Sequence, residues 1–319
     1  MNKNTENIEN LGTQNLVNTR SKIISLISIK NSDNFATKIL KKIILLGLYI
    51  PKKIVHNRRK KSLKSFYSIH CKEVESLLNL VSDDLSRDVI NTQINFIINY
   101  DYTNQNGFLI KNNLMEKHKS LFDEDHYFSK DIIKLSTEEG FVNCGSHIGD
   151  TVEDFVKRTN GKFKHIFAFE PSKINFIELL ATVKKLEIDP TTITCYQKGV
   201  YSENSTCNFN INEEDGGGSS ITKNGGEIIE IVKLDTFLSE NEKNTITFIN
   251  MDIEGAEMDA LVGMHEIIKK NKPKLAISVY HDPEHFWTIP FFIKSLNPEY
   301  KIYFRQHSIS KSETVCYAI

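Results

Sequence analysis

The chain has 319 residues, of which 39% are hydrophobic, 25% charged and 10% aromatic, a globular composition that excludes wholesale disorder, collagen-like repeats and a polytopic membrane protein. Its five cysteines lie far apart without a CxxC pair, which excludes a disulfide scaffold and a zinc ribbon and suits a reducing compartment. The net charge of -1 hides an asymmetry, because residues 1–70 carry 14 Lys and Arg against 3 Asp and Glu while the remainder is acidic.

The basic front end divides into a polar leader and a helical region. We expect residues 1–35 to be a loosely ordered leader without a signal peptide, because the first ten residues are polar. Residues 36–124 are predicted to form a basic, helical N-terminal region. Its apolar run, 43–50, is too short to span a membrane, which takes about 20 residues. The basic side chains between 41 and 61 have two interpretations: a helix lying on anionic lipid, or a helix packed on protein with solvated charges.

Two further patterns lie before the second half of the chain. Apolar residues recur at helical spacing between 70 and 100, which predicts one or two helices. We expect residues 101–135 to be a connector that contains one short helix at 123–135, DEDHYFSKDIIKL.

From residue 138 onward, short β-rich runs alternate with helical segments. This alternation predicts βαβ units and a mostly parallel sheet with helices on both faces. The last two strands are too close in sequence for a crossover, so one of them must be antiparallel. The predicted strands are 141–145, 165–171, 192–200, 245–253, 274–280, 300–306 and 313–319, and the predicted helices are 150–160, 172–187 and 256–270.

One segment, 201–235, interrupts this alternation. The runs CNFNI (207–211) and IIEIVKL (228–234) flank a Gly/Ser-rich stretch, which predicts a β-hairpin insertion. Two interpretations of its tip stay open: a surface loop, or a flap over the functional site.

The first two strands of the alternation end in residues typical of a nucleoside site. In a doubly wound sheet, ligands bind at the carboxyl ends of the strands. Gly145 to Gly149, with the sequence GSHIG, follow the first strand and allow a tight turn ahead of a helix N-terminus. The spacing is GxxxG, not the GxGxxG of a dinucleotide site. Glu170 follows the second strand, where an acid can accept both hydroxyls of a ribose; the alternative is an acid that caps the next helix.

The fourth and fifth strands are followed by candidate catalytic groups. Asp252 and Glu254 lie one residue apart on an extended strand, so they point the same way. Placing charged side chains at the end of an apolar, buried strand costs folding free energy unless they are paired or have a function. The alternative is that Glu254 and Glu257 are first-turn acids of the next helix. His281 and Asp282 could act as a general base and its orienting group, or be structural.

Taken in order, the runs FVNCGSHIGDT, FAFEPS, QKGVYS, VKLDTF, FINMDIEGAE and KPKLAISVYH resemble the FkbM family of S-adenosylmethionine-dependent methyltransferases. The resemblance covers residues 125–319, which we therefore interpret as a methyltransferase domain, and the run FIKSLNPEYKIYFRQHS resembles the sugar-modification members. It implies the seven-stranded, Rossmann-like class I methyltransferase sheet with a C-terminal antiparallel hairpin, in agreement with the strands predicted above.

The resemblance also implies roles for individual residues. The glycine turn would hold the methionine end of the cofactor, Glu170 the ribose, and Lys198 and Gly199 would border the adenine. The family usually has Asp where this chain has Asn143, which accepts a hydrogen bond but lacks the charge that favours an amino group. The residues so assigned to the cofactor are Asn143, Gly145, His147, Gly149, Asp150, Thr151, Glu170, Pro171, Ser172, Lys198, Gly199 and Asp252.

The implied reaction is methyl transfer from S-adenosylmethionine to a sugar hydroxyl of a glycan or glycan precursor. Asp252 and His281 are the candidate bases, with Glu254 beside the transferred methyl. A divalent cation such as Mg²⁺ on Asp252 and Glu254 would suit carboxylates, but the spacing does not require one. Two other functions stay open: a nicotinamide-dependent sugar enzyme, which the missing GxGxxG disfavours, and a catalytically inactive cofactor-binding or scaffold module.

The expected setting follows from the same reasoning. The acceptor is expected to be a sugar or glycan, and no nucleic-acid partner is expected. The basic N-terminal region would contact either a membrane that carries lipid-linked glycans or a partner glycosyltransferase. We expect a cytoplasmic protein, with peripheral attachment to the inner face of the membrane as the alternative.

Overall fold

The computed structural model describes residues 63–99, 120–210, 220–222, 226–308 and 312–319. The chain divides into two compact units, residues 1–74 and residues 75–319. The described part of the first unit is helix α4 (Leu63–Ile69) and the start of helix α5 (Cys71–Leu80). The predicted leader and the basic run up to residue 61 lie outside the described residues, so both interpretations of that run stay predictions.

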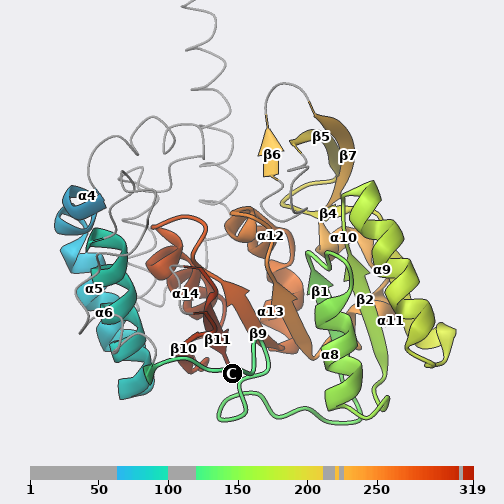
Figure 1. The fold of residues 1–319 in the computed structure, drawn as a ribbon, viewed down its shortest axis with the longest axis horizontal. Helices are drawn as coiled ribbons and strands as arrows, with labels where there is room; N and C mark the ends of the chain where they lie inside the picture. The colour runs from blue at the N-terminus through green and yellow to red at the C-terminus, as the bar shows by residue number, and fades with distance from the viewer. Residues whose placement is uncertain (1–62, 100–119, 211–219, 223–225, 309–311) are drawn as a thin grey trace, which may run out of the picture. The chain divides into compact units, whose positions relative to one another are not determined.

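The second unit is built on a seven-stranded sheet, with the strand order β10-β11-β9-β8-β1-β2-β3 (Figure 1). Neighbouring strands are parallel except at β11, which is antiparallel to both β9 and β10. This confirms the predicted fold class, including the closing antiparallel hairpin. The strands are β1 (Gly140–Cys144), β2 (His165–Phe169), β3 (Ile193–Tyr196), β8 (Phe248–Met251), β9 (Lys274–Ser278), β10 (Ile302–Gln306) and β11 (Thr314–Ala318).

Helices cover both faces of this sheet. The chain steps from β1 to β3 in one direction and from β8 to β9 in the other, so right-handed crossovers place α8 and α9 on one face and α12, α13 and α14 on the opposite face. No helix in the described ranges has both the length and the apolar character needed to cross a membrane. The helices of the alternating region are α8 (Asp150–Arg158), α9 (Lys173–Lys185), α10 (Leu234–Phe237), α11 (Glu240–Lys243), α12 (Glu257–Gly263), α13 (His265–Asn271) and α14 (His285–Leu296).

The predicted single helix at 256–270 is wrong, because the chain forms α12 and α13 with a break at Met264. The physical reason lies in the run VKLDTF. The Asp235 carboxylate accepts hydrogen bonds from Glu266 N (3.2 Å) and Ile267 N (3.1 Å). These amides would otherwise continue the first helix, and their bonds to Asp235 begin a second one.

The predicted short helix at 123–135 is also wrong, because this segment forms turns. Side chains provide the competing hydrogen bonds. Asp123 Oδ1 accepts from Asp125 N (2.9 Å), and Ser129 Oγ donates to Asp131 (2.6 Å). Short polar side chains that bond locally in this way favour turns over helix.

The insertion forms a second, four-stranded sheet with the order β4-β7-β5-β6. Its strands are β4 (Gly199–Val200), β5 (Ser205–Asn210), β6 (Ser220–Thr222) and β7 (Glu227–Val232). The antiparallel pairing of β5 with β7 confirms the predicted hairpin. The predicted strand 192–200 is corrected, because it is divided between β3 of the large sheet and β4, which pairs with β7. Residues 211–219 at the tip lie outside the described residues, so neither interpretation of the tip is tested.

The predicted helices between 70 and 100 are confirmed as α5 and α6 (Asp84–Asn99). The segment around α6 covers the edge strand β10. Ser82 Oγ accepts from Ile302 N (3.1 Å) and Ser86 Oγ accepts from Phe304 N (2.8 Å). An uncovered edge strand leaves such amides available for pairing with another chain. These serines therefore close one edge of the sheet.

Arg305 of β10 joins the same edge to two acidic side chains. It is 3% exposed, and its guanidinium contacts Asp83 Oδ2 (2.7 Å), Ser86 Oγ (3.2 Å) and the Asp131 carboxylate. The two carboxylates are partly exposed, so solvent screens part of the attraction.

We predict that Arg305→Ala lowers the free energy of unfolding by about 3 kcal/mol, the low end for breaking a buried ion pair. The matched control is Lys157→Ala, which removes an exposed pair with Glu153 on α8 and should cost about 1 kcal/mol or less. Urea unfolding measures both variants. Equal losses would contradict a structural role for the Arg305 contacts.

Candidate functional site

The side chains that carry chemistry gather at one edge of the large sheet. The carboxyl ends of β9, β8, β1 and β2 are neighbours there. Because β11 runs antiparallel, its first residues lie at this same edge. The segments that follow these strands are therefore brought together although they are far apart in sequence.

Backbone contacts hold the glycine turn after β1 in place. Gly145 N and Ser146 N both donate to Phe169 O, at 3.0 and 2.9 Å. Gly145 has φ +82°, and a Cβ on it would lie 2.0 Å from Asp252 O. Gly149 has φ +91° and begins α8. Glycine is the residue that adopts such angles without strain, and at Gly145 it also permits the close approach of β1 to the chain after β8.

Glu170 lies directly after β2, with its carboxylate against the glycine turn. It is 5% exposed, and it accepts hydrogen bonds from His147 N (2.8 Å) and Ser172 N (2.9 Å), one on each oxygen. Burial raises the pKa of Glu170 to about 7, although both backbone donors act to lower it. The Asn175 side chain also hydrogen-bonds this carboxylate. A carboxylate has about four acceptor positions, so Glu170 can still accept a further donor.

Asn143 lies below the glycine turn, inside the sheet. Its Nδ2 donates to Oδ1 of Asn250, the residue paired with it on β8, at 2.5 Å. Both side chains are buried, and Asn143 Oδ1 has no hydrogen-bond partner among the described residues. A buried amide oxygen without a partner is an acceptor to which a ligand donor could bind.

A cluster of carboxylates surrounds His281, which follows β9. His281 Nε2 lies 3.4 Å from Asp252 Oδ1 and 3.4 Å from Glu254 Oε2. His281 Nδ1 lies 2.9 Å from Glu257 Oε1. We call these four residues the acid–histidine cluster. Glu254 has φ +56° and Gly255 has φ +89°, so a tight turn after β8 brings the acids of DIEGAE to one histidine.

Glu257 is the fully buried member of this cluster. Its Oε1 accepts from Ile253 N and Gly255 N, both at 3.0 Å, and its Oε2 lies 3.2 Å from His285 Nδ1. The carboxylate therefore organises the turn that follows β8. It is a structural centre of the site as well as one of its charges.

Mutual attraction outweighs burial in this cluster. Burial alone would raise the pKa of Glu257, but His281 and His285 hold it well below its usual range. Burial alone would lower the pKa of His281, but Glu257, Asp252 and Glu254 raise it to about 10. Burial raises the pKa of Asp252, with His281 opposing. The site therefore stabilises a positive charge at His281.

A chain of hydrogen bonds holds the other oxygen of Asp252. Tyr127 Oη donates to Asp252 Oδ2 at 2.5 Å, and Tyr280 Oη lies 3.1 Å from the same oxygen. Tyr280 Oη also lies 3.3 Å from Glu313 Oε1, and His126 Nε2 lies 2.9 Å from Glu313 Oε2. The Tyr280 hydroxyl also lies 3.3 Å from Asp252 Oδ1, the oxygen that faces His281, so the two tyrosines hold the whole carboxylate.

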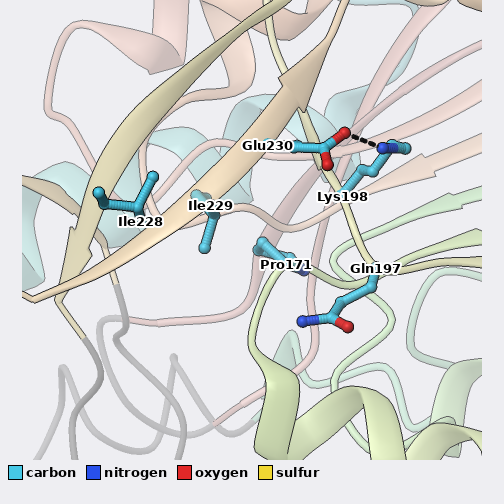
Figure 2. A pocket seen from close by; sticks show the side chains of 6 residues that line it. All are labelled: Pro171, Gln197, Lys198, Ile228, Ile229 and Glu230. Atoms are coloured by element: carbon cyan, nitrogen blue, oxygen red, sulfur yellow. Dashed lines mark hydrogen bonds and ion pairs between the residues drawn. The ribbon is translucent and has the colours of Figure 1, made fainter.

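A cavity of about 300 Å³ opens at the same edge, between the ends of β2 and β3 and strand β7 (Figure 2). The Lys198 ammonium and the Glu230 carboxylate point toward each other across one wall and form an ion pair. The lining residues are Pro171, Gln197, Lys198, Ile228, Ile229 and Glu230.

The structure brings most of the sequence-predicted site residues to this edge. The candidate catalytic residues Asp252, Glu254 and His281 are in contact, as described above. Asp150 and Thr151 are the first residues of α8, directly after the turn. The remaining residues of the prediction are the turn with Asn143 (143–149), the Glu170 segment (170–172) and the Lys198 segment (198–199), all placed above.

The structure also identifies a group that could hold a metal ion. Asp252, Glu257 and His281 each offer a ligand atom, and these atoms lie within 4.8 Å of one another. The cation predicted from the sequence was assigned to Asp252 and Glu254 instead. The predicted pair and the observed group have Asp252 in common, and Glu254 lies 3.4 Å from Nε2 of the same histidine, His281. The predicted cation stays a prediction.

Sequence reasoning missed four side chains of the site. Gln197 directly follows β3, so the rule applied to the residues after the other strands could have found it. Glu313 precedes the antiparallel strand β11. The rule considers only residues at the carboxyl ends of strands, so it does not find a residue at the amino end of β11. Tyr127 was placed in a predicted helix. Glu257 was interpreted as a first-turn acid, which it is in α12, but its contact with His281 was not predicted. For Tyr127 the sequence gives no signal, since its contact with Asp252 spans 125 residues.

Comparisons with known proteins agree with this arrangement. A family model described as the methyltransferase FkbM domain matches residues 143–307, just over half of the chain. The chain is similar in fold to the crystal structure of methyltransferase FkbM from Methylobacillus flagellatus KT, with 24% identity and a TM-score of 0.65. The match covers 81% of this chain and 61% of that one, so the chain spans less than two thirds of that protein. No curated protein matches the chain.

Two further solved structures are similar at lower scores. A chain of a fibrillarin/Nop5p complex has 16% identity and a TM-score of 0.34, covering 58% of this chain and 74% of that one. A putative rRNA methylase from Clostridium thermocellum has 8% identity and a TM-score of 0.37, covering 66% of this chain and 96% of that one.

We predict that Gly145→Ala destabilises the protein more than Gly161→Ala. Both glycines have positive φ, so both variants incur the left-handed strain of about 1–2 kcal/mol. A Cβ at residue 161 has nothing within 4 Å, whereas at residue 145 it overlaps Asp252 O. Overpacking of this kind adds about 1–3 kcal/mol. Urea unfolding would show the difference, and equal losses would mean that β1 and the chain after β8 separate at little cost.

Proposed function

The chain belongs to the methyltransferase FkbM domain family, and from that premise we propose that it is an S-adenosylmethionine-dependent O-methyltransferase that acts on a sugar hydroxyl of a glycan or glycan precursor. The observation that carries the cofactor is the position of Glu170. Its buried carboxylate lies at the carboxyl end of β2, against the backbone of the glycine turn after β1. In sheets of this kind, an acid at that place binds the hydroxyls of a ribose.

The residues present fit S-adenosylmethionine. Glu170 accepts one backbone hydrogen bond on each oxygen and a further one from the Asn175 side chain, and it can accept another from a ribose hydroxyl. Asn143 Oδ1, which lacks a partner among the described residues, could accept from the amino group. The turn 145–149 would hold the methionine end at the start of α8. When bound, the cofactor supplies an electrophilic methyl group on a sulfonium.

The adenine would occupy the cavity between Pro171, Gln197 and Ile229. Its volume of about 300 Å³ is at the lower end for ligand pockets, which run from about 300 to 1,000 Å³. Pro171 and Ile229 offer apolar surface for a planar ring, and the Gln197 amide offers both a donor and an acceptor. Lys198 is paired with Glu230 and so forms the wall of this cavity.

The acceptor hydroxyl would meet the acid–histidine cluster. In the transfer, the sulfonium carbon–sulfur bond breaks as a carbon–oxygen bond to the acceptor forms, and the hydroxyl loses a proton. Asp252 is the group available to receive it, and His281, which carries a positive charge in this cluster, would stabilise the developing negative charge on the acceptor oxygen. Tyr127 and Tyr280 hold the Asp252 carboxylate in one orientation, which serves the alignment that methyl transfer requires.

We predict that the wild-type protein binds S-adenosylhomocysteine with micromolar affinity and that Glu170→Ala weakens this binding about 10- to 100-fold. Hydrogen bonds to a charged group contribute about 1.5–3 kcal/mol, which corresponds to this range. Isothermal titration calorimetry measures the affinity. The matched control is Glu178→Ala, an exposed acid on α9, which should leave the affinity unchanged.

Two results would overturn parts of the proposal. Well-folded wild-type protein that does not bind S-adenosylhomocysteine would exclude the cofactor. Mass spectrometry would detect methyl incorporation into nucleotide-linked and lipid-linked sugars. If the protein binds S-adenosylhomocysteine but methylates none of these sugars, the result would instead support a cofactor-binding module without activity.

We also predict that cofactor affinity depends on pH through Glu170. The ionised carboxylate accepts hydrogen bonds from ribose hydroxyls, and its pKa of about 7 in the free protein means that it is protonated at lower pH. Below pH 7, binding must release this proton, so the dissociation constant should rise by about tenfold per pH unit. Glu170→Gln should remove this dependence. The same slope in wild type and variant would assign the pH effect to another group.

A further inference from the structure

Helix α9 presents an apolar stripe to solvent. Ile174, Ile177 and Leu180 are 64%, 55% and 46% exposed, and they are three of the nine large hydrophobic side chains that are exposed among the described residues. They recur every three residues, so they lie on neighbouring turns of the same side of the helix. Single exposed apolar side chains are ordinary, whereas a group of them on one surface is typical of an interaction site.

The charged side chains beside this stripe have no partners within the described part of the chain. Glu178, Lys184 and Lys185 are exposed, and none of them forms an ion pair or a side-chain hydrogen bond there. On the neighbouring helix α8, by contrast, Lys157 pairs with Glu153. The acid within the stripe disfavours an anionic lipid surface. Charges of both signs on one helix favour a partner surface that also carries both signs.

The residues of this face repeat at intervals of seven, which is close to two helical turns. Glu178 and Lys185 therefore share one flank of α9, and Ile177 and Lys184 share the other. Ala181 lies between the two flanks and is exposed. Its small side chain would permit the close approach of a second helix, because the distance between packed helices depends on the side chains at the contact.

We propose that α9 packs antiparallel against α9 of a second copy of this chain, with the two-fold axis at Ala181. In such an interface the same patch serves both copies, so each contact occurs twice. Glu178 lies three residues before Ala181 and Lys185 four residues after it. The axis would therefore place Glu178 of one copy opposite Lys185 of the other on the same flank, offset by about 1.5 Å along the helices.

The same axis would cover the apolar stripe. Leu180 lies one residue from the axis, so it would contact Leu180 of the second copy. Ile177 would lie opposite Lys184 of the second copy, and the aliphatic stem of a lysine can cover an apolar side chain. Ile174 would lie toward the end of the second copy's helix. The pairing thus satisfies the charged flank and buries the apolar one.

The proposed dimer goes beyond the proposed function and does not depend on it. Helix α9 begins directly after the Glu170 segment, so its first residues lie at the site edge of the large sheet. Because the two α9 helices would be antiparallel, the two site edges would lie at opposite ends of the helix pair. Glu170, Asn143 and the cavity are contributed by one chain. Cofactor binding therefore does not need the dimer.

The test measures self-association of the full chain by sedimentation equilibrium over a range of concentrations. We expect a wild-type dimer with a micromolar dissociation constant. Ile177→Asp should raise this constant about 30-fold or more, because the substitution enters a two-fold interface twice. The matched control is Leu85→Asp, which places the same charge at an exposed apolar residue of α6 and should leave the constant unchanged.

Charge reversal tests the antiparallel arrangement. Glu178→Lys and Lys185→Glu should each raise the dissociation constant about tenfold or more, because each brings like charges together at two places in the interface. The double variant restores opposite charges at both places. Its dissociation constant should return to within about threefold of the wild-type value.

Each outcome decides the proposal. A wild type that stays monomeric would overturn it, and binding of that monomer to phosphatidylglycerol vesicles would assign the stripe to a membrane instead. A dimer that Ile177→Asp leaves intact would also overturn it, as would single charge variants that the double variant does not rescue. The proposed function fails separately, because a wild type that dimerises through α9 without binding S-adenosylhomocysteine would keep this interface and reject the methyltransferase.

Discussion

The contact between Gly145 and the carbonyl of Asp252 is the constraint on which the rest of the site depends. At this point β1 and the chain after β8 approach so closely that a Cβ would lie 2.0 Å from a carbonyl oxygen. The turn that follows β1 and the acids that follow β8 are therefore adjacent by backbone geometry alone. Glu170 is tied to the same turn through His147 N. Glu170 and the acid–histidine cluster are thus held at a fixed separation by the backbone, which is the condition that the proposed in-line transfer between two bound molecules would require.

Burial of charge is the second theme of this edge, and Glu257 shows how the fold satisfies it. A fully buried carboxylate is costly unless it is paired and hydrogen-bonded. Glu257 has two backbone donors and lies between two histidines, so the cost is offset locally. In return it fixes the left-handed turn at Glu254 and Gly255 and the position of His281. A first-turn acid of α12 therefore also organises the turn and the histidine of the acid–histidine cluster.

Strand ends could be predicted from the sequence, whereas the contacts between them could not. Alternating β-rich and helical runs identified the seven strands, the antiparallel hairpin and the edge at which Glu170, Asp252 and His281 lie. Hydrophobic periodicity did not predict α14, because this helix is buried along most of its length and so has no polar face to give an amphipathic pattern. It also contains Pro290, which interrupts the run of helix-forming residues. Hydrophobic periodicity also did not predict the break between α12 and α13, because this break depends on hydrogen bonds to Asp235, a side chain about 30 residues earlier in the sequence. Tyr127 belongs to the same class, because its role appears only when a turn folds onto Asp252.

Asn143 illustrates how a single amide fits where the family usually has an acid. The position is fully buried, and its side-chain partner is the amide of Asn250. A carboxylate there would face Asn250 Oδ1, an acceptor, and would carry a buried charge that this amide does not neutralise. An asparagine avoids that charge and still leaves Oδ1 as an acceptor below the glycine turn.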